Sequence, residues 1–82
     1  DAWPDALSRR IAAAIAQELE LETVPPDMTF DDMDGDSLTA LAAALHIEKV
    51  FGVTIDPMDL LDDILLGDLV AEIADQAEAL GA

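Results

Sequence analysis

Apolar side chains recur every three or four residues near the start of the chain, which is the spacing of one face of an α-helix. The helix is expected to begin around Pro4 and Asp5, because proline suits a first helical turn and an acid there complements the helix dipole. It is expected to run to about Leu21. Its apolar face carries Leu7, Ile11, Ile15 and Leu19.

A second segment, from Ser37 to about Phe51, is apolar on both sides of the helix that it predicts, and Gly52 is expected to end it. One side carries Ala40, Ala43, Ala44, Ile47, Val50 and Phe51. The other side carries Leu38, Leu41, Ala42, Leu45, Glu48 and Lys49, and the charged pair marks it as the solvent side.

One helix of a small domain cannot easily bury two apolar sides. We therefore expect Leu38, Leu41 and Leu45 to be exposed, at the i, i+3 and i+7 spacing of a helix face that anchors a partner. The alternative is that these leucines pack against a neighbouring loop or short helix.

The remaining pattern completes an all-α fold. Asp56 and Pro57 are expected to start a short helix that ends at Leu61. A last helix is expected from about Leu66 to Ala79, with apolar residues Leu66, Leu69, Val70, Ile73, Ala77 and Leu80.

Pro25 and Pro26 place a long loop between the first and second helices, and four of its apolar side chains are expected to hold it to the core. These four are Val24, Met28, Phe30 and Met33. The sequence thus predicts one domain, residues 1–82: a four-helix bundle of three long helices and a short third helix.

Charge narrows the range of partners. The chain has 82 residues, with 19 acidic against 3 basic side chains and a formal net charge of -16. This balance argues against nucleic acid and against an anionic membrane surface, since both need Lys and Arg. Hydrophobic residues make up 52% of the chain, which favours a folded domain over a disordered acidic tail. A monomer in the cytoplasm is expected.

The absence of cysteine excludes a thiolate nucleophile and a cysteine metal site. The acids concentrate in the segment DDMDGDSL, residues 31–38, and three hypotheses compete to explain it. As an EF-hand loop that starts at Asp32, it places Ser37 where glycine is required and Ala43 where the bidentate acid is required. We therefore predict no metal site of this kind.

The second hypothesis is a helix cap, in which either Asp36 or Ser37 caps the second helix. The third is covalent attachment to Ser37 by another enzyme, since a phosphodiester there would lie at a helix N-terminus, which favours negative charge. His46, the single histidine, lies about two turns further along, so Ser37 has no evident catalytic base and the chain is not expected to be an enzyme.

The segment from Phe30 to Leu38 resembles the phosphopantetheine-attachment motif of acyl and peptidyl carrier proteins. In that motif a Phe precedes a Leu, two small residues, an Asp, the modified Ser and a Leu. The matching residues here are Met33, Asp34, Gly35, Asp36, Ser37 and Leu38. HIEKVFGVTIDPMDLLDD and GDLVAEI resemble the end of the family's second helix and the start of its last one, so the resemblance covers nearly the whole chain.

This resemblance implies that a phosphopantetheinyl transferase attaches phosphopantetheine to Ser37, next to Asp36. The chain would then carry acyl or aminoacyl groups as thioesters between a loading enzyme and a downstream synthase or transferase. The family's partner surface runs along the second helix, and the matching residues here are Leu38, Leu41, Leu45 and Glu48.

Three departures from the family pattern stand out. Asp34 replaces a small residue, Leu65 lies where a Thr often caps the last helix, and Ala42 and Lys49 lie where fatty-acid carriers are often acidic. The last departure favours polyketide or nonribosomal peptide biosynthesis. The competing hypothesis from another class is an acidic module that docks a basic partner without covalent modification. Asp31, Asp32 and Asp34 remain without a function at this point.

Overall fold

The first helix is fixed by its two ends. A computed structural model describes residues 3–81, so residues 1, 2 and 82 of the expected domain lie outside the described part. Helix α1 spans Ala6–Glu18, and Asp5 is its N-cap, whose Oδ1 accepts a hydrogen bond from the Ser8 amide at 2.7 Å. Pro4 therefore precedes the helix rather than forming its first turn.

Helix α1 ends three residues before the predicted Leu21, because the chain turns left-handed at Glu20, with φ of 61°. The Leu21 amide donates to the Ala16 carbonyl at 2.9 Å and the Glu20 amide donates to the Gln17 carbonyl at 3.2 Å. This pair of bonds is a Schellman motif, in which glycine usually takes the left-handed position. Because Glu20 replaces that glycine, no signal in the sequence marked the end.

The other three helices lie where the sequence predicts them. They are α2 (Ser37–Phe51), α3 (Pro57–Leu61) and α4 (Leu66–Ala79), and a 3₁₀ turn, η1 (Asp31–Met33), precedes α2. Gly52 ends α2 with φ of 74°, and Asp56 caps α3 by accepting from the Met58 amide at 2.9 Å. The all-α bundle of three long helices and a short third helix is confirmed within residues 3–81.

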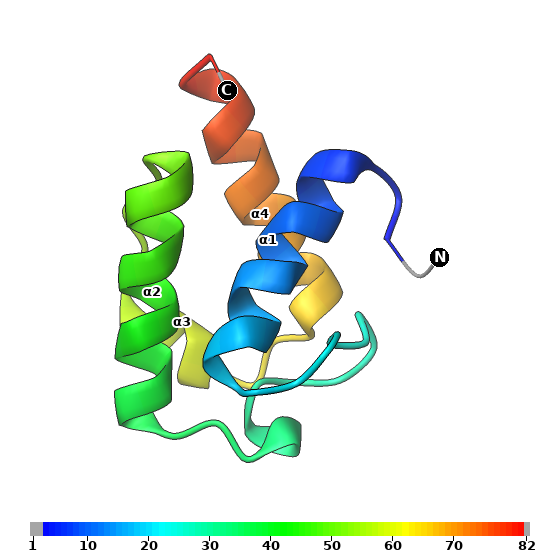
Figure 1. Cartoon of the computed structure of the whole chain (residues 1–82), viewed down its shortest axis with the longest axis vertical. Coiled ribbons are helices and arrows are strands. Elements are labelled where there is room, and N and C mark those ends of the chain that lie inside the picture. The colour runs from blue at the N-terminus through cyan, green and yellow to red at the C-terminus, as the bar shows by residue number, and fades with distance from the viewer. Residues whose placement is uncertain (1–2, 82) are drawn as a thin grey trace.

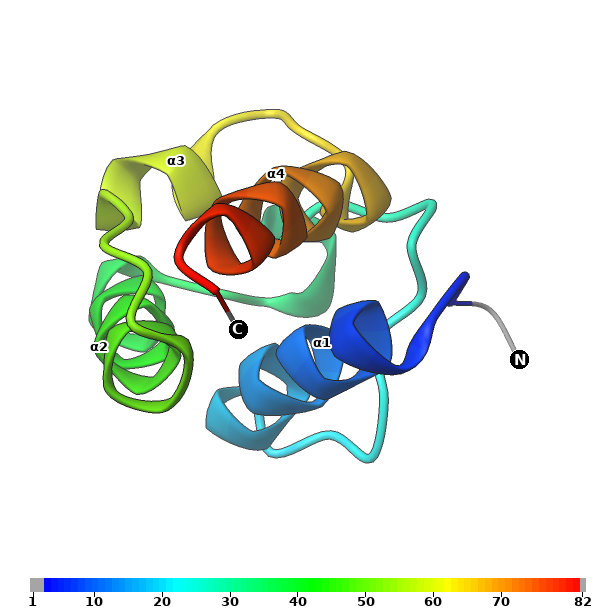
Figure 2. The same ribbon diagram turned by 90° about the horizontal axis from the view of Figure 1, so that it is seen from above.

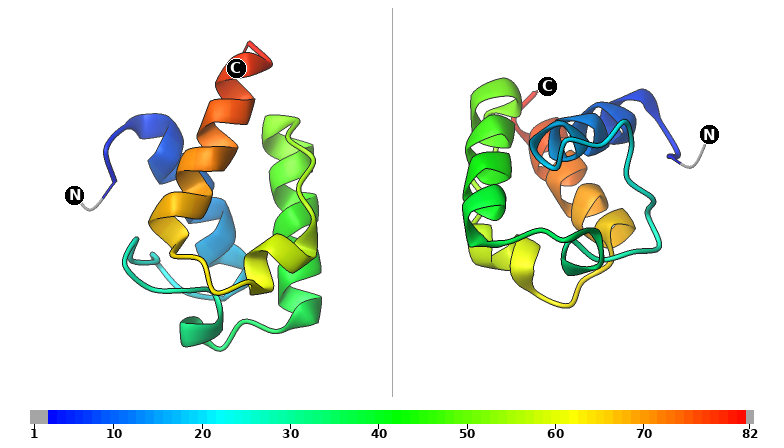
Figure 3. Two further views of the ribbon diagram at one scale, coloured as in Figure 1. Left: turned by 180° about the vertical axis from the view of Figure 1, so that it is seen from behind. Right: turned by 60° about the horizontal axis from the view of Figure 1, so that its bottom comes forward.

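The three long helices surround the core, and α3 bridges α2 and α4 at one end of the bundle (Figures 1 and 2). Helix α1 packs against both α2 and α4. The start of α2, the turn η1 and α3 all lie at the same end of the molecule (Figure 3). The chain therefore presents Ser37 at the end where the long loop, α2 and α3 meet.

The core is built from the apolar faces that the periodicity identified, with two corrections. The largest fully buried side chains include Ile11, Ile15, Phe30, Ile47, Leu60, Leu66 and Ile73. Val50, assigned to the buried side of α2, is 50% exposed because it faces the open edge between α1 and α2. Leu80, assigned to the apolar face of α4, is 64% exposed because it lies past the last helical residue. Among residues 3–81, every helix is too short or too polar to span a lipid bilayer.

The long loop is fastened to the start of α4. The Leu66 amide donates to the Met28 carbonyl and the Gly67 amide to the Pro26 carbonyl, each at 2.8 Å, and Thr29 and Leu65 form an isolated antiparallel bridge. These bonds take the place of a side-chain cap, which Leu65 cannot provide. A Cβ on Gly67 would lie 3.0 Å from the Pro26 carbonyl oxygen, so glycine permits this close approach.

Candidate functional site

Ser37 is the first residue of α2, and the residue before it caps the helix. Asp36 has extended backbone, and its Oδ1 accepts hydrogen bonds from the Thr39 amide at 2.8 Å and from the Thr39 hydroxyl at 2.9 Å. Of the two capping residues considered from the sequence, the structure selects Asp36. The Ser37 side chain is therefore not used for capping.

The Ser37 side chain is exposed, and its hydroxyl has no hydrogen-bond partner among residues 3–81. A group bonded to Ser37 Oγ would lie at the N-terminus of a 15-residue helix. Free amide groups and the helix dipole favour negative charge at that end, so the position fits a phosphodiester. The carboxylate of Asp36 is held toward Thr39, which leaves the Ser37 hydroxyl unobstructed by its neighbour.

The hydrogen bond from the Thr39 amide, followed by the one from the Thr39 hydroxyl, lowers the pKa of Asp36 below its ordinary value of 3.8. Asp36 is thus ionised at neutral pH beside Ser37. The same cause acts at the start of α1, where hydrogen bonds from Ser8 lower the pKa of Asp5.

Two of the aspartates left without a function from the sequence shape the loop before Ser37. Asp32 Oδ2 accepts from the Thr29 amide, and Thr29 Oγ1 accepts from the Asp32 amide, each at 3.1 Å. Asp34 adopts the left-handed conformation, with φ of 62°, and its amide donates to the Asp31 carbonyl at 3.0 Å. The carrier-protein motif has a small residue at the position of Asp34. The left-handed conformation accounts for both choices, since glycine, asparagine and aspartate tolerate it best.

Gly35 brings the loop against the core. The Gly35 amide donates to the Phe30 carbonyl at 3.1 Å, and the Phe30 side chain is fully buried. A Cβ on Gly35 would lie 2.2 Å from the Phe30 ring, which no packing tolerates. The turn that leads into Ser37 is thus set by the contact between these two residues.

The acids near Ser37 do not converge on a common point. Among residues 3–81, no three His, Cys, Asp or Glu side chains are grouped so that they could hold a metal ion. Sequence reasoning missed the structural function of Asp32, although the spacing Thr29-x-x-Asp32 is that of a reciprocal N-terminal cap. The fastening of the loop by Gly67 had no local signal, since it joins segments about 40 residues apart.

The leucines of α2 face solvent as expected. Leu38, Leu41 and Leu45 are 77%, 45% and 56% exposed. Glu48 is exposed and accepts a hydrogen bond from the Thr54 hydroxyl at 3.0 Å. The surface of α2 that starts beside Ser37 is therefore apolar, and its single carboxylate is already hydrogen-bonded.

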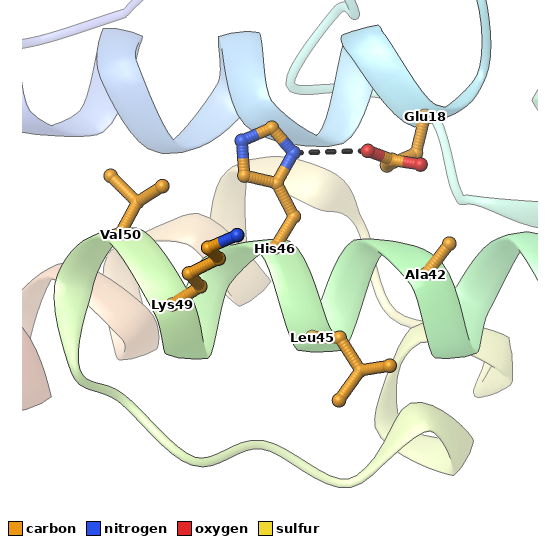
Figure 4. A pocket seen from close by; sticks show the side chains of 6 residues that line it. All are labelled: Glu18, Ala42, Leu45, His46, Lys49 and Val50. Atoms are coloured by element: carbon orange, nitrogen blue, oxygen red, sulfur yellow. Dashed lines mark hydrogen bonds and ion pairs between the residues drawn. The ribbon is translucent and has the colours of Figure 1, made fainter.

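A groove of about 530 Å³ follows α2 on the side that faces the end of α1 (Figure 4). It is lined by Glu18 from α1 and by Ala42, Leu45, His46, Lys49 and Val50 from α2. His46 Nδ1 and Glu18 Oε2 lie 3.0 Å apart across the two helices. His46 thus contacts α1 rather than Ser37, which agrees with its expected place away from the serine.

Comparison with known proteins matches the sequence of this chain to one family. The family model described as "Phosphopantetheine attachment site" matches residues 9–73. The chain is 33% identical over 75 residues to proteins named "Acyl carrier protein" from Streptococcus pyogenes serotype M3 and Streptococcus pneumoniae serotype 4. In each case the match covers 89% of this chain and 99% of the relative. No solved structure gives a significant match.

Proposed function

This chain belongs to the phosphopantetheine-attachment family that includes the acyl carrier proteins, and from this premise we propose that Ser37 is the residue to which its phosphopantetheine is attached. Members of this family are non-catalytic carriers that partner enzymes modify and use. The cofactor is bonded covalently to a serine, so the question for this chain is which serine receives it.

The exposure of Ser37 supports its assignment as the attachment residue. The chain has two serines, Ser8 and Ser37. Ser8 is 4% exposed, and its amide is bonded to Asp5 within the first turn of α1. Ser37 has an exposed hydroxyl with no protein partner among residues 3–81, at the start of a long helix. A transferase can approach Ser37 without unfolding the chain, whereas Ser8 is enclosed.

Bound phosphopantetheine supplies the thiol that this cysteine-free chain lacks, and the thiol carries cargo as a thioester. Residues of the chain present Ser37 and keep its surroundings ordered: Asp36 caps α2, and Gly35 seats the turn against Phe30. Tethering raises the local concentration of the cargo at a partner's active site. The partners in this proposal are a phosphopantetheinyl transferase, an acyl-loading enzyme and a downstream synthase or transferase.

We propose that these partners dock on the solvent side of α2, on Leu38, Leu41 and Leu45, with Glu48 at the edge. Support comes from the exposure of the three leucines and from their position along the helix that Ser37 begins. The docking surface is mainly apolar, because Glu48 is hydrogen-bonded to Thr54 and the remaining acids lie in loops and on other helices.

For the cargo, the name shared by the matched relatives favours an acyl group over an aminoacyl group. The apolar and basic residues Ala42 and Lys49 on α2 support a specialised pathway, such as polyketide or nonribosomal peptide biosynthesis, over fatty-acid synthesis. Acyl transfer measured with a polyketide ketosynthase and with a fatty-acid ketosynthase tests this choice. Faster transfer with the fatty-acid enzyme contradicts it.

The proposal also includes a monomer located in the cytoplasm. A formal net charge of -16 supports the monomer, since like charge on every copy opposes association. Sedimentation over a range of concentrations tests the monomer, and cell fractionation tests the location.

Intact mass measured after incubation with coenzyme A and a broad-specificity transferase tests the assignment of Ser37. We expect one phosphopantetheine to be added to the wild-type chain and to Ser8→Ala, and none to Ser37→Ala. No addition to the wild type, under conditions that modify a known carrier, favours the competing function of an acidic interaction module. Addition to Ser37→Ala assigns the cofactor to another residue.

A further inference from the structure

A row of side chains leads along α2 from the attachment residue to a lysine. Leu38, Ala42, Leu45 and Lys49 are spaced i, i+4, i+7 and i+11, so they share one side of the helix within a sector of about 60°. The row begins one residue after Ser37 and ends about 17 Å further along the helix axis. Its last three members line the groove between α1 and α2 (Figure 4).

The end of this row is positively charged, whereas most charged residues of the molecule are acidic. Lys49 is the one lysine or arginine of α2, in a chain with 3 basic and 19 acidic residues. Its ammonium group has no ion pair or hydrogen bond with any residue among 3–81. The other titratable groups of the groove are Glu18 from α1 and His46 from α2, and His46 Nδ1 lies 3.0 Å from Glu18 Oε2. The ammonium group of Lys49 therefore has no counter-ion of its own.

The distance along this row matches the reach of a tethered group. Between Ser37 Oγ and the terminal sulfur, phosphopantetheine has about as many backbone atoms as an extended peptide of five residues, which spans roughly 17 Å. A fully extended arm therefore spans the whole row, and an arm that is not fully extended places its sulfur near Ala42, so that a short acyl chain continues past Leu45 to Lys49. Apolar contacts along most of the row and a single cation at its end suit a short acyl chain that terminates in a carboxylate.

We propose that the groove of Ala42, Leu45 and Lys49 binds the chain's own thioester cargo, and that it selects acyl groups with a terminal carboxylate, the half-thioesters of dicarboxylic acids. This inference rests on the attachment of phosphopantetheine to Ser37. The carboxylate pairs with Lys49, and the methylene groups lie on Ala42 and Leu45. Most of the surface of so acidic a chain repels an acidic cargo, and Lys49, the one lysine or arginine of the groove, gives such a cargo a favourable position there.

The test compares two cargoes of equal chain length. A transferase loads Ser37 from glutaryl-coenzyme A or from pentanoyl-coenzyme A, which differ only in the terminal carboxylate. Intact mass first establishes that loading is complete. Amide chemical shifts of Ala42, His46, Lys49 and Val50 are then compared between the two loaded forms. We expect shifts with the glutaryl form that the pentanoyl form lacks, and we expect them to fade with added salt, as for an exposed ion pair.

Three variants separate recognition of the carboxylate from general effects of charge. Lys49→Met should remove the difference between the two cargoes, and Lys49→Arg should keep it. Arg9→Met removes one positive charge from α1 outside the groove, so it serves as the matched control and should keep the difference. Lys49 also complements the dipole in the last turn of α2. Any loss of stability from that source is common to both cargoes and cancels in the comparison.

The expected preference is modest, up to about fivefold in the ratio of bound to free cargo, because the ion pair is exposed to solvent. Equal shifts with both cargoes overturn the selection of carboxylates. If neither fully loaded form shifts these amides relative to the form that carries phosphopantetheine without cargo, the groove is not a cargo site. The attachment at Ser37 stays intact in that case. Failure to load at all appears in the mass and overturns both proposals.

Discussion

Thr29 and Asp32 are hydrogen-bonded to each other twice, each through its side chain to the other's amide, at 3.1 Å in both directions. The pair closes the turn η1 on the buried Phe30, which lies between them in the sequence. Asp32 is therefore not simply one more charge near Ser37. It is a structural residue of the attachment loop.

Replacing Asp32 by Ala should lower the free energy of unfolding by about 0.5–2 kcal/mol, the usual cost of losing a side-chain cap. Chemical denaturation measures this loss. Asp31→Ala is the matched control, because it removes the same charge from an exposed neighbour whose side chain accepts no hydrogen bond among residues 3–81. It should change stability by less than about 0.5 kcal/mol. Equal effects of the two substitutions would assign the result to charge alone.

The cap on α2 should weaken in acid. Hydrogen bonds from Thr39 hold the pKa of Asp36 below 3.8 in the folded chain, so the ionised carboxylate stabilises the fold above that pH. This contribution is lost as the pH falls through the lowered pKa. The Thr39 amide shift, followed by NMR from pH 6 downward, should move in that acidic range. Asp36→Asn keeps a capping acceptor without a titrating group, so the corresponding transition should disappear.

Gly35→Ala should destabilise the chain by about 1–3 kcal/mol and slow the modification of Ser37, because the new methyl group forces the Phe30 ring out of its place. Thermal melts and the initial rate of transfer from coenzyme A measure the two effects. Gly52→Ala, at the other end of α2, is the control.

At Gly52 the backbone is left-handed, with φ of 74°, and no atom lies within 4 Å of an added Cβ. Alanine there should cost about 1 kcal/mol through backbone strain. The rate of Ser37 modification should stay unchanged after correction for the folded fraction. A parallel fall in both variants would show that transfer follows global stability and not the geometry of the turn.

Substituting Asp for Leu38 or Leu41 should slow the reactions of loaded carrier with partner enzymes while changing stability by less than about 0.5–1 kcal/mol, since both side chains are exposed. Single-turnover transfer rates and denaturation curves measure the two quantities. Ile47→Ala, on the fully buried side of the same helix, should instead cost about 2–5 kcal/mol. If the Leu41→Asp variant is unfolded, Leu41 belongs to the core and not to the docking surface.

Glu20→Gly should raise the free energy of unfolding by about 0.5–1 kcal/mol, because glycine adopts the left-handed conformation at the end of α1 without steric cost. Denaturation in urea measures the gain. Glu20→Gln is the control, since it removes the charge and retains the strained backbone. A gain of equal size in both variants would identify relief of charge repulsion as the cause.

The sequence predicted most of the fold because short-range signals agreed with the apolar pattern. Gly52, and Asp56 with Pro57, marked helix ends that the structure reproduces. The errors fall where one local signal was missing or ambiguous. Glu20 occupies a left-handed position at which a glycine would have predicted the end of α1. Val50 lies between the two faces of α2, and periodicity alone cannot decide which neighbour covers such a residue.

The candidate site was predicted at Ser37 from its motif, but its surroundings depend on contacts between distant segments. The reciprocal hydrogen bonds of Thr29 and Asp32 could have been predicted from their capping-box spacing. The pairing of His46 with Glu18, and the groove that ends at Lys49, require the packing of α1 on α2. No pattern within either helix specifies how the two will be placed relative to each other.

Two amides of α4 report on whether the long loop is in place. The amides of Leu66 and Gly67 are satisfied by carbonyls of Met28 and Pro26, and not by their own helix. Their exchange with deuterated solvent is therefore slow only while the loop stays in place, whereas amides further along α4 are protected by the helix itself. Comparing exchange at these two positions before and after Ser37 is loaded would show whether cargo loosens or tightens the segment that presents it.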